Sequence, residues 1–373
     1  MSGRGAPTCF AVVTGGGTSG HVLPALAIAE GLVAAGHEPA SIHYIGAQRG
    51  IETRLVPPTP FPHTFLDVIG VQRRLDRSNL LFPLKLVRAT ARAFHLLRRI
   101  RPRVVVSVGG YASLPAVIAA RLLRTPVVGV SYDRRPGQSS RLTARFAAAN
   151  AVAFPDSPLP RARYTGAPLR QAILAVDPAR DRDAARGALG LPLDRFVVAV
   201  SGGSLGSGVL NEAVTGLVAA AADRLDLAVR HIVGERFLGQ ASSARAGDSG
   251  ILYQVIGYEE QMPLVYAAAD VVVARAGAST IAELAAVGVA SILVPWAGAA
   301  EDHQTDNARV LGDPGAAVVV AEGELSAERL MAEIDALVGD PARRAAMART
   351  ARQLGEVHRS NALVALVEEV AAR

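Results

Sequence analysis

Two short apolar strands, half a chain apart, each run directly into a glycine-rich loop, and this repeated unit constrains the fold most. Phe10–Val13 precedes the loop Thr14-Gly-Gly-Gly-Thr-Ser-Gly-His21, and Phe196–Val200 precedes Ser201-Gly-Gly-Ser-Leu-Gly206. A buried strand that opens through glycines into a helix leaves backbone N–H groups free to bind an anion. Ligands of parallel sheets bind beyond the carboxyl ends of the strands. The two units therefore predict two open α/β domains facing a cleft, and an enzyme that handles a phosphorylated substrate.

The rest of the chain alternates apolar runs with amphipathic stretches of helical period, which predicts doubly wound parallel sheets. A chain of 373 residues is long enough for two domains. We interpret the proline-rich stretch 155–168 as a linker between an N-terminal domain over 1–160 and a C-terminal domain over 161–360. The last helix, within 361–373, is predicted to pack back onto the first domain. The predicted strands are Phe10–Val13, Ile42–Ile45, Val104–Val108, Val127–Val130, Ala151–Phe154, Phe196–Val200, Val229–Val233, Tyr253–Ile256, Val271–Val273 and Ser291–Val294.

Composition and charge exclude several classes of protein. Cys9 is the only cysteine, which excludes an intramolecular disulfide and a multi-cysteine metal site. The net charge of +6 comes almost wholly from arginine and favours an acidic partner such as phosphate or anionic lipid. Nucleic acid is disfavoured because the chain lacks a basic-aromatic platform. No apolar run of about 18 residues and no signal peptide is recognisable, so a cytosolic location is expected.

The first glycine loop is compatible with more than one ligand. A dinucleotide site would need an acid at the end of the second strand, which reads Ile42-His-Tyr-Ile45, so an NAD-dependent oxidoreductase is disfavoured. His21 follows the loop at the start of the next helix. The positive end of the helix dipole favours the neutral imidazole that a general base needs. A histidine bonded to the backbone near the helix start explains the sequence equally well.

The second half of the chain offers polar groups for a sugar or nucleoside. Glu283 lies near the start of a helix that follows Gly277, where its carboxylate could accept both hydroxyls of a ribose. A capping acid is an equally good explanation. The stretch from Pro295 to Asn307 is polar after its strand and suits sugar hydroxyls.

Four segments in order along the chain resemble the MurG family of peptidoglycan glycosyltransferases, which have two Rossmann-like domains (the GT-B fold, glycosyltransferase family 28). Residues 16–25 resemble the first glycine motif of the family, 108–113 the second and 202–206 the third. Residues 270–307 are similar to its donor-binding region. The resemblance covers nearly the whole chain.

The resemblance implies an inverting transferase that moves N-acetylglucosamine from UDP-GlcNAc to lipid I, undecaprenyl-diphospho-MurNAc-pentapeptide, and so forms lipid II. It implies that His21 is the general base. No acidic motif for an obligatory metal is evident in the sequence, so no obligatory cofactor is expected. Glu259 would meet uracil through its backbone, Glu283 would hold the ribose, and Gln304 would bind sugar hydroxyls. The donor-binding residues implied in this way are Thr18, Ser19, Gly20, Asp133, Arg170, Ser204, Glu259, Ala278, Ser279, Thr280, Ile281, Ala282, Glu283 and Gln304.

Asp133 departs from the family pattern, because it stands where the family has an asparagine. An ionised aspartate accepts hydrogen bonds only, and it repels a diphosphate unless Arg134 or Arg135 compensates. Asp133 is also a second candidate base, ranked below His21 because an exposed aspartate is a weak base at neutral pH.

A lipid acceptor implies contact with a membrane. The segment 71–103 mixes apolar and cationic residues, which suits shallow insertion among anionic headgroups at the cytoplasmic face of the membrane. An amphipathic helix with a solvated basic face is the alternative. The residues expected on the acceptor or membrane side are Tyr111, Leu80, Leu81, Phe82, Lys85 and Arg88.

Three other functions stay open at this point. A related transferase would glycosylate a different polyprenyl or lipid acceptor, and Asp133 would favour it. A UDP-sugar 2-epimerase uses the same two-domain architecture and would need no acceptor. A non-catalytic protein would bind the nucleotide sugar without depending on His21. Other proteins of cell-wall synthesis are further expected partners of a family member, and nucleic acid is not.

Overall fold

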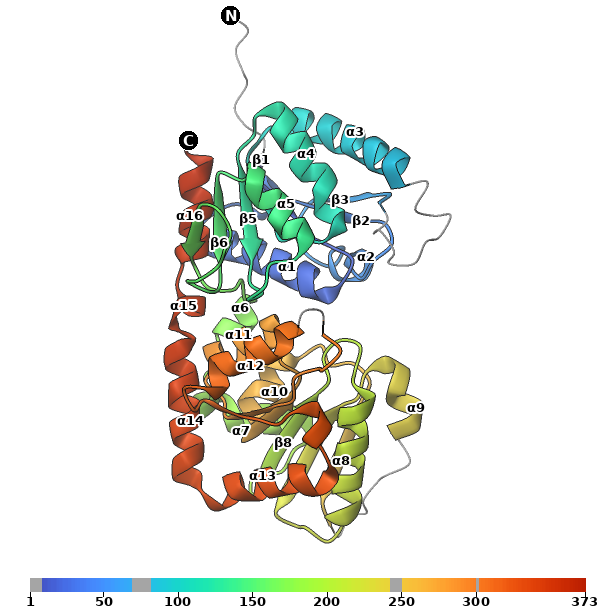
Figure 1. Cartoon of the computed structure of the whole chain (residues 1–373), viewed down its shortest axis with the longest axis vertical. Coiled ribbons are helices and arrows are strands. Elements are labelled where there is room, and N and C mark those ends of the chain that lie inside the picture. Colours follow the sequence, from blue (N-terminus) through green and yellow to red (C-terminus); the bar gives the residue numbers. More distant parts are fainter. Residues whose placement is uncertain (1–8, 69–81, 242–249, 300–301) are drawn as a thin grey trace, which may run out of the picture. The chain divides into compact units, whose positions relative to one another are not determined.

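The computed structural model describes residues 9–68, 82–241, 250–299 and 302–373 (Figure 1). The chain divides into two compact units, residues 1–171 with 360–373, and residues 172–359. Each unit is built around a parallel sheet whose strands are connected through helices. The predicted fold class, α/β with two Rossmann-like domains, is therefore confirmed.

The sheet of the first unit has seven parallel strands among the described residues, in the order β3-β2-β1-β4-β5-β6-β7. The order reverses between β1 and β4, which pair in parallel with Thr14 beside Ser107. Open α/β sheets bind ligands at the carboxyl edge of such a switch point. The strands are β1 (Cys9–Thr14), β2 (Ile42–Ala47), β3 (His63–Leu66), β4 (Pro102–Ser107), β5 (Val127–Ser131), β6 (Ala149–Val152) and β7 (Ala162–Tyr164).

Helices cover the first sheet on both faces. Ala89, Ala93 and Leu97 of α3 repeat at helical spacing and are buried together with Val12 and Val105 of the sheet. The helix α16 contacts β4, β5, β6 and α1, which itself contacts β1. Burial from both sides explains why consecutive strand residues are all apolar. The helices are α1 (Ser19–Ala34), α2 (Glu52–Leu55), α3 (Phe82–Ile100), α4 (Leu114–Leu123), α5 (Gln138–Phe146) and α16 (Ala362–Ala371), with 3₁₀ turns η1 (Pro39–Ser41) and η3 (Tyr111–Ser113). The short helix α6 (Gln171–Leu174) begins at the last residue of the segment 1–171 and belongs mostly to the second unit.

The sheet of the second unit has six parallel strands in the described part of the chain, in the order β10-β9-β8-β11-β12-β13. Its switch point lies between β8 and β11, where Ser201 pairs with Ala274. Both units therefore place a glycine loop at the switch point of the sheet. The strands are β8 (Phe196–Ser201), β9 (Leu227–Ile232), β10 (Leu252–Ile256), β11 (Val271–Ala274), β12 (Ser291–Leu293) and β13 (Ala317–Val319).

The core of the second unit joins one face of this sheet to α8 and α13. Val198, Val200 and Val273 pack there with Leu217 of α8 and Ile334 of α13. The helices are α7 (Pro178–Leu189), α8 (Gly208–Ala220), α9 (Leu238–Ala241), α10 (Met262–Ala268), α11 (Ala278–Val287), α12 (His303–Gly312), α13 (Ala327–Gly339), α14 (Pro341–Leu354) and α15 (Glu356–Arg359), with 3₁₀ turns η4 (Glu235–Phe237) and η6 (Glu322–Glu324).

Three short strands were not among those predicted. β3, β7 and β13 are edge strands with at most one buried residue each, so they lack the apolar run of a strand inside the sheet. β7 lies inside the stretch 155–168 that we interpreted as a linker, and it forms the edge of the first sheet. Its residues are partly or fully exposed, so the apolar signal of a buried strand is missing.

A buried ion pair connects α7 to two strands of the second sheet. Arg186 is fully buried and donates to Asp270 Oδ2 at 2.7 Å. The same carboxylate accepts from Val197 N at 2.7 Å and pairs with Arg182 at 2.8 Å. Arg186 also donates to backbone carbonyls, among them Ala268 O at 3.0 Å. The guanidinium thus satisfies groups that water cannot reach.

We expect Arg186→Met to lower the free energy of unfolding of the second unit by about 3–5 kcal/mol, because it strands a buried carboxylate and several carbonyls. Urea unfolding measures the change. Arg224→Met is the matched control, because Arg224 pairs with Asp226 and Asp335 at the surface and its loss should cost at most about 1 kcal/mol. Equal losses in the two variants would contradict this interpretation.

Candidate functional site

The first candidate region is the carboxyl edge of the first sheet, where two glycine motifs meet. A Cβ atom on Gly110 would lie 2.6 Å from Gly16 O, and one on Gly17 would lie 2.8 Å from the Tyr111 ring. Gly17 and Gly110 also have φ angles of 94° and 77°, a region that favours glycine. The loops after β1 and β4 therefore pack backbone against backbone, and side chains at these positions would separate them.

Buried polar side chains hold the first glycine loop from below. Glu52 is fully buried and accepts hydrogen bonds from Gly17 N at 3.2 Å and from Ala47 N at 2.8 Å. Tyr44 donates its hydroxyl to Gly15 O at 2.5 Å. These two contacts hold the first half of the loop, at Gly15 and at Gly17. Sequence reasoning missed Glu52, whose only signal is an acid close to Gly50 in a short helix.

His21 lies in the first turn of α1, beside the second glycine motif. A Cβ on Gly110 would be 3.5 Å from the His21 ring, an ordinary van der Waals contact, so the imidazole lies directly beside this glycine. Thr18 Oγ1 lies 3.1 Å from His21 Nδ1. Burial lowers the pKa of His21, which keeps the ring neutral at neutral pH. When Nδ1 donates to Thr18, Nε2 carries the lone pair that a base requires.

The other predicted residues of this unit lie around the same edge or on its helices. Ser19 and Gly20 are partly exposed at the start of α1. Asp133 is partly exposed in the loop after β5. Arg134, expected to offset Asp133, bonds to Asp156 at 2.7 Å. The structure thus groups Thr18, Ser19, Gly20, His21 and Tyr111 on neighbouring loops.

Arg170 is paired within the first unit. Its Nε and Nη2 atoms both lie 2.6 Å from Glu30 Oε1 on α1. Glu30 also accepts from Gln171 N at 3.1 Å, so it anchors the end of this unit to α1. Arg170 is partly exposed. Its contact with the donor stays a prediction.

The second candidate region is the carboxyl edge of the second sheet, beside β8 and β11. Ser204 and Leu205 are exposed at the tip of the loop after β8. Ser207 closes this loop as the N-cap of α8 and accepts from Leu210 N at 3.4 Å. Gly206 has a φ of 68°, and a Cβ there would collide with the carbonyl of Val233. The exposed tip therefore rests on a loop that is closely packed at its base.

The first turns of α11 follow β11 at the same edge. Gly277 is the N-cap residue, and Ser279 and Thr280 are partly exposed. Ala278, Ile281 and Ala282 are buried in the core. Ile281 and Ala282 therefore line a ligand only through their backbone, whereas Ser279 and Thr280 also offer hydroxyls.

Glu283 lies one turn further along α11 and is held by a tyrosine of α10. Tyr266 donates its hydroxyl to Glu283 Oε2 at 2.7 Å. Burial raises the pKa of Glu283 to about 7, and the hydrogen bond from Tyr266 opposes this rise. One carboxylate oxygen is thus engaged and the carboxyl titrates near neutral pH.

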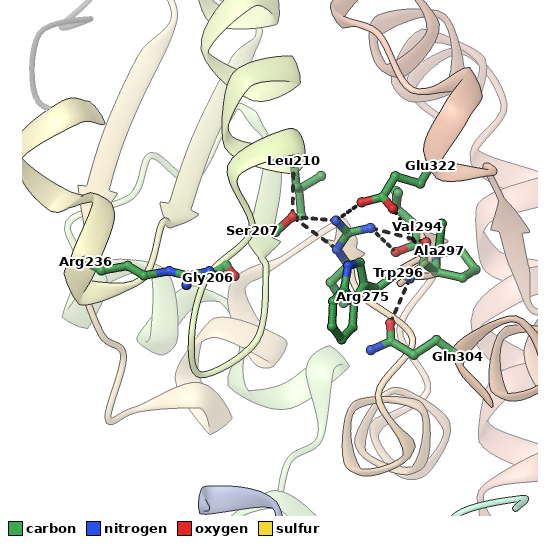
Figure 2. A network of polar contacts seen from close by, with 11 residues as sticks. Gly206, Ser207, Leu210, Arg236, Arg275, Val294, Trp296, Ala297, Gln304 and Glu322 are labelled. Atoms are coloured by element: carbon green, nitrogen blue, oxygen red, sulfur yellow. Dashed lines mark hydrogen bonds and ion pairs between the residues drawn. The ribbon is translucent and has the colours of Figure 1, made fainter. Parts of the chain in front are cut away.

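Two further predicted residues hold loops through their side chains. Glu259 pairs with Arg230 at 2.5 Å and accepts from Gln261 N at 2.8 Å, which fixes the loop after β10. Gln304 Oε1 accepts from Trp296 N at 3.0 Å, which leaves its NH₂ group pointing away from the loop (Figure 2). The contact of this NH₂ group with a sugar hydroxyl stays a prediction.

Sequence reasoning also missed Arg275, which directly follows β11 and precedes α11. Its guanidinium is buried among Ser207, Glu322 and the loop after β12 (Figure 2). The only sequence signal is an arginine between two alanines at the end of a buried strand. No group of three or more metal-ligating side chains is found among the residues that the structure describes.

The predicted membrane segment is described only in part. Leu80 and Leu81 lie outside the described residues, as does the side chain of Phe82. Lys85 Nζ lies 3.2 Å from Asp67 Oδ1, and Arg88 is exposed on α3. Further exposed apolar side chains on α3 and α4 are Leu84, Val87, Ile118 and Leu122. Within the described ranges, no helix has both the length and the apolar character to cross a membrane.

Sequence comparisons place both units in one family. The model of the glycosyltransferase family 28 N-terminal domain matches residues 11–152, and the model of the C-terminal domain matches residues 197–362. A relative from Desulforudis audaxviator is 37% identical, with 97% of this chain and 98% of the relative covered. One from Alkalilimnicola ehrlichii is 40% identical, with 92% and 94% covered. Both are named UDP-N-acetylglucosamine–N-acetylmuramyl-(pentapeptide) pyrophosphoryl-undecaprenol N-acetylglucosamine transferase.

Solved structures share the same architecture. MurG of Acinetobacter baumannii matches with a TM-score of 0.72 and 25% identity, with 98% of this chain and 100% of that chain covered. UDP-GlcNAc 2-epimerase of Neisseria meningitidis, solved with UDP-GlcNAc, matches with a TM-score of 0.65 and 11% identity, with 96% and 99% covered. The second likeness concerns the fold alone.

The raised pKa of Glu283 makes stability depend on pH. Folded protein keeps this proton up to a pH of about 7, whereas the unfolded chain loses it near the ordinary value of 4.5. Raising the pH between these values therefore favours unfolding. We expect the stability of Glu283→Gln relative to wild type to rise over this window and to level off above it, as measured by urea unfolding at several pH values.

The control is Glu212→Gln, which removes an exposed glutamate of α8. Comparing the two variants at each pH separates the effect of burial at Glu283 from the general effect of removing a glutamate. A Glu283→Gln difference that is flat across this range would contradict a carboxyl that resists ionisation.

Proposed function

Because this chain belongs to glycosyltransferase family 28, we propose that it transfers N-acetylglucosamine from UDP-GlcNAc to lipid I and so forms lipid II in peptidoglycan synthesis. The observation that carries the proposal is sequence identity of 37–40%, over nearly the whole chain, to relatives that are named as this N-acetylglucosamine transferase. The contacts of the second sheet edge support it, because the exposed Ser204 loop and the N-terminus of α11 lie at the same edge as Glu283 and Gln304.

The second unit binds the donor in this proposal. The N–H groups of the Ser204 loop and of the first turn of α11 receive the diphosphate, where the helix dipole favours negative charge. Glu283 accepts from the ribose hydroxyls, and the loop of Glu259 presents its backbone to uracil. The NH₂ group of Gln304 donates to a sugar hydroxyl. By the family resemblance, Thr18, Ser19, Gly20 and Arg170 are further residues proposed to bind the donor.

His21 acts as the general base. Nε2 takes the proton of the acceptor hydroxyl while its oxygen forms a bond to the anomeric carbon of GlcNAc, which inverts that centre. The bond from this carbon to the diphosphate oxygen breaks, and UDP leaves with the electron pair. Backbone N–H groups of the donor loops stabilise the charge that develops on UDP. Because the pKa of His21 is lowered, the imidazole stays unprotonated at pH values below the usual pKa of histidine.

Asp133 sets the main question about the acceptor. Its carboxylate stands where the family has an asparagine, and it can only accept hydrogen bonds. A group of the lipid substrate that donates a hydrogen bond therefore fits beside Asp133 better than a group that accepts one. This residue favours a second candidate function, transfer of the same sugar to a different polyprenyl acceptor.

A polyprenyl acceptor requires the enzyme to work at the cytoplasmic face of the membrane as a peripheral protein. Exposed Leu84, Val87 and Leu122 offer apolar contacts, and Arg88 and Arg121 beside them offer cations for anionic headgroups. Other proteins of cell-wall synthesis are proposed as partners on the same membrane.

Incubation of the full chain with radiolabelled UDP-GlcNAc and a lipid I analogue tests the proposal. Labelled lipid II is the expected product. Binding of the donor without transfer would favour a different acceptor, and conversion of UDP-GlcNAc in an acceptor-free control would favour an epimerase. Absence of donor binding would overturn the proposed function altogether.

We expect His21→Ala to lower kcat by about a hundred- to ten-thousandfold, because the acceptor hydroxyl loses its base. The Kd for UDP, measured by calorimetry, should stay unchanged. His63→Ala is the matched control, since His63 is an exposed histidine on β3 and bonds to a backbone carbonyl. Near-normal turnover of His21→Ala would exclude this residue as the base.

We expect Val87→Glu to weaken binding to vesicles that contain anionic phospholipid, because it places a charge among the exposed apolar residues of α3. Co-sedimentation measures the bound fraction. Leu225→Glu introduces the same change at an exposed leucine of the second unit and should bind as wild type does. Wild-type binding that is independent of anionic lipid content would contradict this membrane contact.

A further inference from the structure

Arg275 is 7% exposed, and all of its donor nitrogens have partners (Figure 2). Nε and Nη2 donate to Ser207 Oγ at 3.2 and 2.6 Å. Nη1 donates to Val294 O at 3.1 Å and to Pro295 O at 3.2 Å. Nη2 also pairs with Glu322 Oε1. A guanidinium has five N–H donors, and this environment supplies five acceptor contacts.

Glu322 continues the network on the other side. Its Oε2 atom accepts from Ala297 N at 2.9 Å, so Arg275 and Glu322 hold the stretch 294–297 after β12 between them. The next contact leads to the proposed sugar site, because Trp296 N donates to Gln304 Oε1. The side chains of Arg275 and Glu322 are 8% and 16% exposed, so water screens the pair weakly.

Ser207 joins the same network to the glycine loop. Its hydroxyl oxygen accepts from Arg275 and from Leu210 N, the first turn of α8. The residue before it, Gly206, is held by Arg236, which donates to its carbonyl at 3.3 Å (Figure 2). The loop that carries Ser204 is thereby connected through one arginine to the loop that orients Gln304.

We propose that Arg275 and Glu322 are positioning residues that hold the diphosphate loop and the sugar loop in one fixed arrangement, without touching the donor themselves. The inference rests on the proposed function, since it assigns these loops to the donor. Turning Arg275 toward a diphosphate would break its contacts with Ser207 and two carbonyls and leave Glu322 as a buried, unpaired charge. Preorganised donors bind a developing charge without reorganisation, which is what a fixed arrangement supplies.

The rival role for Arg275 is a direct phosphate ligand, and Glu322 separates the two by the sign of an effect. If Arg275 bound the diphosphate, Glu322 would compete with it, and Glu322→Gln would tighten UDP binding. If Arg275 and Glu322 hold the loops, Glu322→Gln weakens UDP binding. The N–H group of Ala297 and the guanidinium of Arg275 are both donors, and the amide of glutamine turns a second donor toward one of them.

The experiment measures Kd for uridine, UDP and UDP-GlcNAc by calorimetry with the full chain. In Glu322→Gln and in Ser207→Ala, UDP and UDP-GlcNAc should bind about ten- to a hundredfold more weakly, the range expected of misplaced contacts. Uridine should bind as to wild type, because the loop of Glu259 and Glu283 itself lie outside the network. A general loss of structure would weaken uridine as well.

Surface pairs of the same unit supply matched controls. Asp335→Asn and Arg224→Met remove the same charges from an exposed pair and should leave all three affinities unchanged. Arg275→Met combined with Glu322→Gln should weaken UDP no more than Arg275→Met alone, because the two residues act as one unit.

Tighter UDP binding by Glu322→Gln, or unchanged binding by both Glu322→Gln and Ser207→Ala, would overturn the inference. Either result leaves the proposed function intact, since wild type would still bind the donor and transfer the sugar. Failure of wild type to bind UDP would instead overturn the proposed function, and this inference with it.

Discussion

Close approach of backbone to backbone at the ends of the strands is the constraint on which both candidate regions depend. The carbonyl of Gly16 occupies the space of a side chain at Gly110, and the carbonyl of Val233 occupies that of a side chain at Gly206. Parallel strands bring their carboxyl ends to one edge of each sheet, so loops far apart in sequence meet there. Glycine lets these loops pack closely enough for their N–H groups to face one ligand.

Glycines have no side chains that could hold a loop in place, and in both units buried polar side chains of other residues do this. Glu52 holds the first glycine loop through backbone N–H groups, and Arg275 with Glu322 holds the loops after β8 and β12. Arg230 does the same for the loop after β10 through Glu259. For the loops held by Arg275 with Glu322 and by Arg230 with Glu259, removal of one partner would leave a buried charge unpaired.

Local sequence patterns were enough to predict part of this structure. The rest depends on contacts between residues that lie far apart in the sequence. Strands such as β1 and β8 are continuous apolar runs beside glycines, so their existence followed from sequence. Edge strands such as β7 have too few buried residues to show a pattern. Glu283 and His21 could be named as candidates, but the hydrogen bond from Tyr266 to Glu283 joins different helices. Arg275 had no local sign of its role, because Ser207 and Glu322 lie 68 and 47 residues away.

Burial disfavours the charged form of both ionisable groups in the proposed reaction, but the consequences differ. It lowers the pKa of His21 and raises that of Glu283 to about 7, so both favour the neutral form. A neutral imidazole is the form that accepts a proton, so burial prepares the base. A neutral carboxyl, in contrast, accepts ribose hydroxyls less well than a carboxylate does. As the pH falls, the carboxyl proposed to hold the ribose is therefore neutralised before the proposed base is protonated.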